Sequence, residues 1–274
     1  MRVQTPKCAH GAMIAASERR LDFFVVGVQK AGTTALHEML SRRPDIQMAS
    51  GKEVHFFDDE TINWNEPDCD RLHSRFSWKP ARVRGEATPI TIYWPNALER
   101  LHAYNPNAKI IVALRHPAHR AFSHWRMERE RGYETLSFSE AIREGRQRVT
   151  ASSNGAHRVF SYVERGYYDE QIERLPGLFP RERVHFYKAN DLFARPRETL
   201  GAIFSFLGAE RPSYAIETEY VTPVPSPPAR MDDGDLTLLR GEFEWRFDRV
   251  ERLTGVSLLD WRAPDYEEPM RSLV

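Results

Sequence analysis

The sequence has few cysteines, no net charge and no long apolar run. Its two cysteines, Cys8 and Cys69, are too few for a disulfide framework and lack metal-knuckle spacing, so they favour a reducing compartment. The 39 basic residues balance 39 acidic ones, which argues against a general nucleic-acid binder. No segment approaches the roughly 18 consecutive apolar residues of a membrane span. These absences predict a cytoplasmic protein with no nucleic-acid partner and no membrane span.

The order of apolar patterns predicts the fold. Residues 1–20 have no apolar period and predict a flexible leader, and residues 21–274 predict one folded domain. Within this domain, short apolar runs of strand type alternate with helical patterns, which predicts an α/β fold with a central parallel sheet flanked by helices. Ligands of such sheets bind beyond the carboxyl ends of the strands. The expected strands cover residues 23–28, 109–114 and 184–187, and the expected later helices cover 97–104, 117–131, 138–147, 168–178, 197–207 and 235–253.

A glycine- and threonine-containing turn, GVQKAGTT, follows the first expected strand and opens a helical pattern. Backbone N–H groups and the positive helix end at such a turn form an anion cradle. A nucleotide-triphosphatase loop would have lysine where Thr33 stands, whereas Lys30 comes three positions earlier. The strand 109–114 ends in Arg115 and not in the aspartate that helps to hold magnesium. The turn predicts an anion site without a metal; taken alone, it is also compatible with a simple helix cap.

Several ordered segments carry a family resemblance. VVGVQKAGTTALHEMLSRRPDI followed by KEVHFFD resembles the start of sulfotransferases that use 3′-phosphoadenosine 5′-phosphosulfate (PAPS), and in particular the branch of heparan sulfate and Nod-factor-type carbohydrate enzymes, in a bacterial form. GEATPITIYWP, IVALRHPAHRAFSHW, RGYYDEQIERL and TGVSLLDW resemble later landmarks of this branch. The resemblance runs from about Phe23 to Trp261. It implies the P-loop-like sulfotransferase fold, PAPS as donor, 3′-phosphoadenosine 5′-phosphate (PAP) as product, and no metal.

The resemblance also implies which residues bind the donor. Lys30 would lie beside the oxygen that bridges phosphorus and sulfur, where a cation stabilises the charge that grows as the sulfuryl group leaves. Arg115 and Ser123 would hold the 3′-phosphate, because a guanidinium offers two-point hydrogen bonding to phosphate. Arg230 is the sole cation of the connector 220–230, which matches the loop that closes over the donor. The 5′-phosphosulfate cradle would consist of Gln29, Lys30, Ala31, Gly32, Thr33 and Thr34.

An alcohol acceptor needs a general base, which contributes roughly 10²- to 10⁴-fold to the rate. Glu53 in KEVHFFD matches the catalytic glutamate of the carbohydrate branch. His55 is the rival, because phenol and steroid sulfotransferases use histidine; otherwise we expect it to contact the acceptor or to pack. Phe56 and Phe57 are expected in the core. His116 stands where the family has aspartate, and we expect it to be exposed to solvent, with altered support of its turn as the alternative.

A further difference from the heparan-type enzymes bears on the class of acceptor. Heparan-type enzymes commonly have lysine at the position of Ala87, and this loss together with the balanced charge argues against a long polyanion. We therefore expect direct in-line sulfuryl transfer to a hydroxyl of a glycan, a glycolipid or a small hydroxylated metabolite. The alternatives are a phenol or small-molecule sulfotransferase with a histidine base, a Mg-ATP-dependent P-loop kinase, and a nucleotide-binding module without activity.

Overall fold

A five-stranded, fully parallel sheet forms the centre of the protein. The computed structural model describes residues 19–78, 83–152, 154–209 and 230–268. The strand order is β2-β3-β1-β4-β5, and every neighbouring pair is parallel, which confirms the predicted α/β fold. The strands are β1 (Phe23–Gly27), β2 (Ile46–Met48), β3 (Val83–Ala87), β4 (Lys109–Leu114) and β5 (Val184–Lys188).

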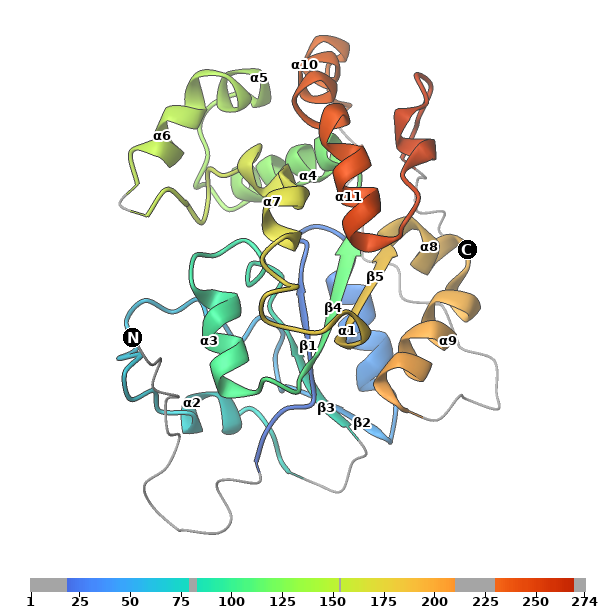
Figure 1. The fold of residues 1–274 in the computed structure, drawn as a ribbon. Helices are drawn as coiled ribbons and strands as arrows, with labels where there is room; N and C mark the ends of the chain where they lie inside the picture. Colours follow the sequence, from blue (N-terminus) through green and yellow to red (C-terminus); the bar gives the residue numbers. More distant parts are fainter. Residues whose placement is uncertain (1–18, 79–82, 153, 210–229, 269–274) are drawn as a thin grey trace.

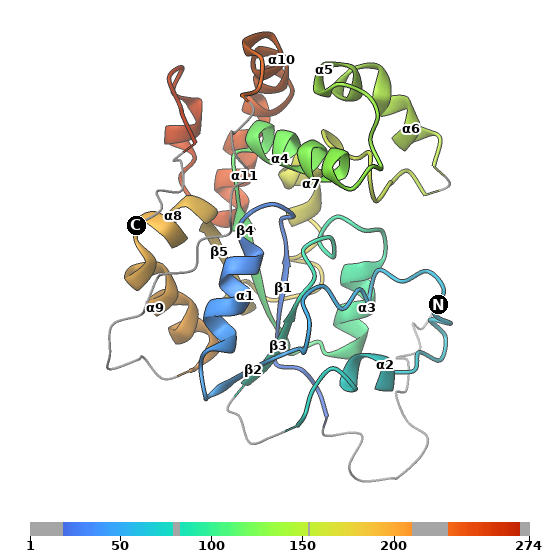
Figure 2. The same cartoon turned by 180° about the vertical axis from the view of Figure 1, so that it is seen from behind.

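Helices cover both faces of this sheet and its carboxyl edge. Helices α1 and α9 lie on one face and α3 lies on the other, as the two opposite views show (Figures 1 and 2). The strands point toward α4, α7 and α11, which lie beyond their carboxyl ends (Figure 1). The described helices are α1 (Thr33–Ser41), α2 (Asp70–His73), α3 (Ala97–Tyr104), α4 (Pro117–Glu130), α5 (Phe138–Ile142), α6 (Gln147–Thr150), α7 (Tyr168–Ile172), α8 (Ala189–Ala194), α9 (Pro196–Leu207), α10 (Asp233–Phe243) and α11 (Phe247–Thr254).

The core is built around β1, whose residues are all buried because both sheet faces are covered. Its neighbour β3 was not predicted, since its sequence VRGEA has no apolar run. Gly85 in β3 allows the ring of Phe23 to pack directly against the backbone. A Cβ atom at this position would lie 2.4 Å from the nearest ring carbon of Phe23. Close packing of an aromatic ring against glycine therefore takes the place of the missing apolar side chains in β3.

The other expected elements are confirmed in place but not always in length. The helix 97–104 and the strand 109–114 occur with the expected bounds. The expected helix 168–178 is wrong in its second half, because α7 ends at Ile172, ahead of the Pro176–Gly177 pair. The expected helix 138–147 is interrupted at Arg143, where φ is −105° and ψ is −89°. Among the described helices, none is both long and apolar enough to span a membrane.

The termini of the chain and Cys69 add two further observations. Most of the expected leader, residues 1–18, lies outside the described residues. Cys69 is disulfide-bonded, which the low number of cysteines did not predict.

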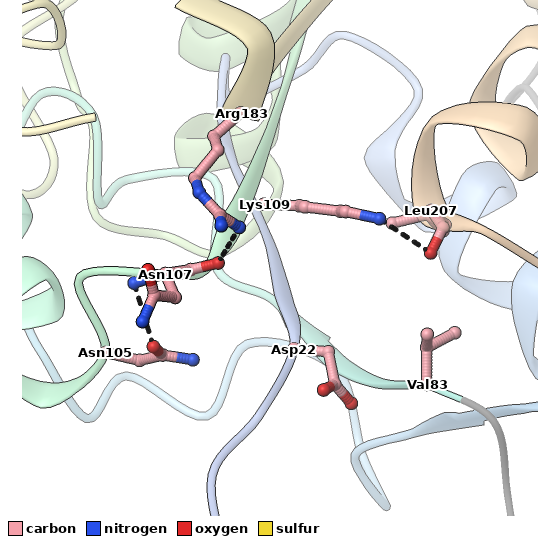
Figure 3. Close-up of a pocket in the computed structure, with 7 residues that line it drawn as sticks. All are labelled: Asp22, Val83, Asn105, Asn107, Lys109, Arg183 and Leu207. Carbon is pink, nitrogen blue, oxygen red and sulfur yellow. Dashed lines mark hydrogen bonds between the residues drawn. The ribbon is translucent and has the colours of Figure 1, made fainter. Parts of the chain in front are cut away.

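A cavity of about 210 Å³ lies at the amino-terminal edge of the sheet, opposite to the loop after β1 (Figure 3). Both of its cations are already paired with backbone carbonyls. The Lys109 Nζ atom donates to the Leu207 oxygen at 2.9 Å, and Arg183 Nη1 donates to the Asn107 oxygen at 2.5 Å. This cavity therefore belongs to the packing of strand starts. Its lining residues are Asp22, Val83, Asn105, Asn107, Lys109, Arg183 and Leu207.

Candidate active site

The loop between β1 and α1 lies at the point where the chain changes direction in the sheet. From β1 the chain crosses to β2 and β3 on one side, whereas β4 pairs with β1 on the other side. Such a switch point leaves a crevice at the carboxyl ends of the strands. Gly32 precedes α1 with a φ of 74°, a left-handed conformation that glycine adopts without strain. The topology thus places the residues after β1 next to those after β4.

Lys30 lies in this loop with its ammonium group mostly buried. Its Nζ atom lies 3.5 Å from the Met127 sulfur of α4, and in the part of the chain that the structure describes it has no ion-pair partner. Burial, together with the nearby charges of Arg115, Arg131 and Lys52, lowers the pKa of Lys30 to about 8, against a smaller opposite effect of Glu53. An anion bound here would relieve the excess positive charge.

Arg115 follows β4 and contacts the loop directly. Its Nη1 atom donates to the backbone oxygen of Lys30 at 2.7 Å, and its own backbone oxygen accepts from the Tyr168 hydroxyl at 2.8 Å. The rest of the guanidinium binds Glu268, whose carboxylate raises the pKa of Arg115 against the opposing effect of burial. Arg115 and Lys30, which lie 85 residues apart in the chain, are therefore neighbours in space.

The other expected donor residues have different environments. Ser123 is half-buried on α4, one helical turn before Met127, so it lies on the side of the helix that faces Lys30. Arg230 is exposed and lies shortly before α10, and the remaining connector residues 220–229 lie outside the described residues.

His116 corrects one expectation. It was expected at the surface but is only 1% exposed, and its ring stacks on Tyr266 with 4.9 Å between centroids. Burial lowers the pKa of His116 to about 3, assisted by His119 and Arg240, so the imidazole is neutral at physiological pH. The side chain is buried because the C-terminal segment of the described chain covers it.

Glu53 and His55 lie in the loop that passes the end of β3. The Glu53 backbone nitrogen donates to the Ala87 oxygen at 3.1 Å, and the His55 nitrogen donates to the Thr88 hydroxyl at 3.3 Å. Five non-glycine residues have a positive φ in the described chain, and Lys30, Glu53 and His55 are three of them. Sparsely populated backbone conformations of this kind cluster at functional sites.

The side chains of this loop form an ion network. Lys52 Nζ lies 2.5 Å from one carboxylate oxygen of Glu53, and His55 Nε2 lies 3.4 Å from the other. His55 Nδ1 lies 2.8 Å from an oxygen of Asp58. Hydrogen bonds to Asp58 and Glu53 raise the pKa of His55 to about 9 against the effect of burial. Burial favours a neutral Glu53, but the contacts with His55 and Lys52 outweigh it and lower its pKa to about 2.

Sequence reasoning missed Asp58 and Arg158. The Asp58 side chain is fully buried, and Arg158 Nη1 donates to its carboxylate at 2.6 Å, while Nη2 contacts its backbone oxygen. Arg158 also lies over the Trp94 ring at 4.3 Å. Asp58 belongs to the KEVHFFD segment, so its place three residues after His55 was a usable signal. Arg158 lies 100 residues further along the chain, and no sequence pattern links it to Asp58.

A buried acid lies beneath this network. Glu86 of β3 is 2% exposed and accepts a hydrogen bond from the Thr88 hydroxyl at 2.7 Å. Burial raises the pKa of Glu86 to about 7, with Thr88 acting in the opposite direction. Since Thr88 also accepts from the His55 nitrogen, Glu86 fixes the hydroxyl that supports the loop.

Arg165 connects the two halves of the site. Its Nη1 atom donates to the side-chain oxygen of Gln29, and its Nη2 atom donates to the backbone oxygen of Arg158 at 2.7 Å. The residue is 2% exposed, and burial, followed by the field of Arg120, lowers its pKa to about 10. The loop after β1 and the support of Asp58 are thus held by one guanidinium.

Comparison with known proteins agrees with the motifs. The family model described as sulfotransferase domain matches residues 20–220. The chain belongs to this family. Its relatives include heparan sulfate glucosamine 3-O-sulfotransferase 6 of Mus musculus, which is 30% identical over 210 residues that cover 74% of this chain and 57% of the relative. Membrane-associated sulfotransferase kil1 of Dictyostelium discoideum is 23% identical over 268 residues, 70% of this chain and 57% of that protein.

The family fold is found in solved structures as well. A crystal structure of a sulfotransferase from Alicyclobacillus acidocaldarius matches this sulfotransferase domain with a TM-score of 0.77 and 27% identity, and the match covers 89% of this chain and 100% of that one. The predicted sulfotransferase fold is therefore confirmed. The chain spans somewhat over half the length of the curated relatives described above.

Proposed function

We propose that this sulfotransferase-family protein transfers a sulfuryl group from PAPS to a hydroxyl group of a glycan, a glycolipid or a small hydroxylated metabolite. The observation that carries the proposal is the hydrogen bond from Arg115 Nη1 to the Lys30 oxygen. This hydrogen bond places two cationic residues side by side, and the donor needs one cation for each phosphorylated end of its nucleoside. A site for a nucleotide with a single phosphorylated end would not require both cations at one edge of the sheet.

In this proposal the donor lies across the carboxyl ends of β1 and β4. The turn from Gln29 to Thr34 holds the 5′-phosphosulfate with backbone N–H groups at the start of α1. Arg115 binds the 3′-phosphate, assisted by the Ser123 hydroxyl on α4. Lys30, which lacks an ion-pair partner among the described residues, lies beside the bridging oxygen. Its buried ammonium group stabilises that oxygen most strongly when the sulfur–oxygen bond breaks.

The proposed chemistry is an in-line displacement. The acceptor oxygen forms a bond to sulfur while the bond between sulfur and the bridging oxygen breaks, and the bridging oxygen retains the electron pair. Glu53 accepts the proton of the acceptor hydroxyl. The products are a sulfate ester and PAP, whose new phosphate charge Lys30 stabilises.

The protonation states favour Glu53 over His55 as the base. With a pKa raised to about 9, His55 already has a proton on each ring nitrogen at neutral pH, and those nitrogens face Asp58 and Glu53. Glu53 is ionised, so it has lone pairs available for a proton. In this arrangement His55 orients Glu53, and Asp58 with Arg158 orients His55. The phenol-type alternative needs a neutral His55.

The charges around Glu53 support a neutral acceptor. Two cations of the base network have acidic partners: Lys52 pairs with Glu53, and Arg158 pairs with Asp58. A long polyanion would instead require a row of unpaired cations. Relatives named as heparan sulfate sulfotransferases make a carbohydrate hydroxyl the leading acceptor class for this chain.

Calorimetric titration tests the donor assignment. We expect PAP to bind at least about tenfold more tightly than AMP or ATP, a difference of about 1.4 kcal/mol, and we expect Arg115→Ala to abolish this preference. Arg197→Ala, which removes an exposed arginine of α9, is the matched control and should leave the preference intact. Equal binding of PAP and AMP by the wild-type protein would contradict the assignment. Activity that depends on ATP and is lost with a chelator would favour the kinase alternative.

A further inference from the structure

The cation assigned to the 3′-phosphate already has an anion of the protein bound to it. Arg115 Nε lies 3.0 and 2.9 Å from the two carboxylate oxygens of Glu268, and Nη2 contacts the second oxygen as well. The two side chains are mostly buried, with 19% and 15% of their surfaces exposed. This is the two-point geometry in which a guanidinium also binds phosphate. Glu268 lies 153 residues after Arg115, so only the tertiary structure brings them together.

The segment that holds Glu268 is attached through Tyr266. The Tyr266 ring stacks on His116 with an interplanar angle of 18°, and its hydroxyl accepts a hydrogen bond from Asn190 Nδ2 at 2.9 Å. Its backbone nitrogen donates to the Ala263 oxygen at 3.0 Å. His116 is buried and neutral, so it offers an aromatic face without repelling or attracting the carboxylate. Tyr266 therefore places Glu268 at the guanidinium with little freedom.

The contacts of Arg115 leave no room for two anions. Nη1 is used by the Lys30 oxygen, and Nε and Nη2 are used by Glu268. A 3′-phosphate can form a two-point contact with Arg115 only if Glu268 leaves. We propose that Glu268 is a built-in competitor of the 3′-phosphate: its carboxylate occupies the 3′-phosphate position in the free protein and is exchanged for that phosphate when the donor binds. This inference rests on the proposed function.

The exchange affects only ligands that have a 3′-phosphate. The apparent dissociation constant of PAP equals the intrinsic constant divided by the fraction of protein in which Glu268 has left Arg115. AMP has no group that competes for Arg115, so its affinity is independent of Glu268. Removing the carboxylate therefore increases the affinity for PAP selectively. If Glu268 is bound in about nine molecules out of ten, the increase is about tenfold.

The test is calorimetric titration of the full chain with PAP and with AMP. Glu268→Gln keeps the size of the side chain and removes its charge, and we expect it to bind PAP about tenfold more tightly, with AMP affinity within about twofold of wild type. Tyr266→Ala detaches the segment from His116. Like Glu268→Gln, this variant should bind PAP more tightly and leave the affinity for AMP nearly unchanged. The matched control is Glu267→Gln, which removes the neighbouring, exposed carboxylate and should change neither affinity.

Three results would overturn the inference. Unchanged or weaker PAP binding by Glu268→Gln would mean that Glu268 does not compete with the phosphate. An equal gain for PAP and AMP would mean that the segment hinders the nucleotide as a whole and does not compete with the 3′-phosphate. A gain in the Glu267→Gln control would mean that net charge alone is responsible. Arg115→Ala distinguishes a failure of the donor assignment from a failure of the exchange. If this variant keeps the preference for PAP, the donor assignment itself fails. If it loses the preference while Glu268→Gln leaves PAP affinity unchanged, only the exchange is refuted.

Discussion

The sharpest prediction concerns the base. Glu53→Gln keeps the shape of the side chain but removes the group that accepts the proton. Because a positioned base contributes roughly 10²- to 10⁴-fold, we expect kcat to fall by this factor, which corresponds to about 2.7–5.4 kcal/mol in the activation barrier. Among the described residues, no hydrogen bond or ion pair joins the Glu53 side chain to the loop after β1, so PAP affinity should stay within about twofold. Sulfated product from labelled PAPS measures kcat, and calorimetry measures PAP binding.

The pH profile gives an independent check of the same prediction. Glu53, with a pKa near 2, is fully ionised above about pH 4, so kcat/KM should be flat from pH 5.5 to 7.5. If His55 were the base, the rate would rise with pH up to its pKa of about 9. Glu66→Gln, which changes an exposed carboxylate, is the control. The reasoning is refuted if Glu53→Gln keeps more than about a third of wild-type kcat while His55→Ala loses activity.

Three further predictions follow from particular contacts. Lys30 is protonated below its pKa of about 8, so kcat/KM for PAPS should fall about tenfold per pH unit above pH 8. A kcat/KM that stays constant above pH 8 would show that Lys30 does not act as a cation. Arg158→Gln removes the ion pair with Asp58 that orients His55 and Glu53, and we expect kcat to fall about 10- to 100-fold with PAP affinity unchanged. Gly85→Ala should clash with Phe23 and lower the unfolding free energy by about 1–3 kcal/mol in thermal denaturation, whereas Gly241→Ala, with open space around it, should not.

Much of the fold followed from the sequence because its central strands are apolar and bounded by turns. The strand 109–114 and the helix 97–104 were predicted with the bounds that the structure has. The parallel sheet then required Lys30 and Arg115 to meet at one edge, and their hydrogen bond is observed. The strand β3 was missed because a charged, glycine-containing segment gives no strand signal when close packing replaces apolar side chains.

The parts of the site that escaped prediction depend on long-range contacts. Asp58 is held by Arg158, and Arg115 is held by Glu268, in both cases across 100 residues or more. No local pattern announces such pairs, because each charged residue is compatible with a solvated surface until the fold is known. The burial of His116 has the same origin, since it depends on the position of Tyr266 near the end of the described chain.

The central place of β1 has a consequence for biosynthesis. Both partners of this strand come later in the chain, β3 from residue 83 and β4 from residue 109, so neither is available when β1 leaves the ribosome. The apolar segment FFVVG has two open edges that other chains can join until β3 is complete at Ala87, and one edge stays open until β4 is complete at Leu114. Slow translation through this stretch should therefore promote aggregation, and a chaperone that shields the nascent strand should raise the yield of folded protein.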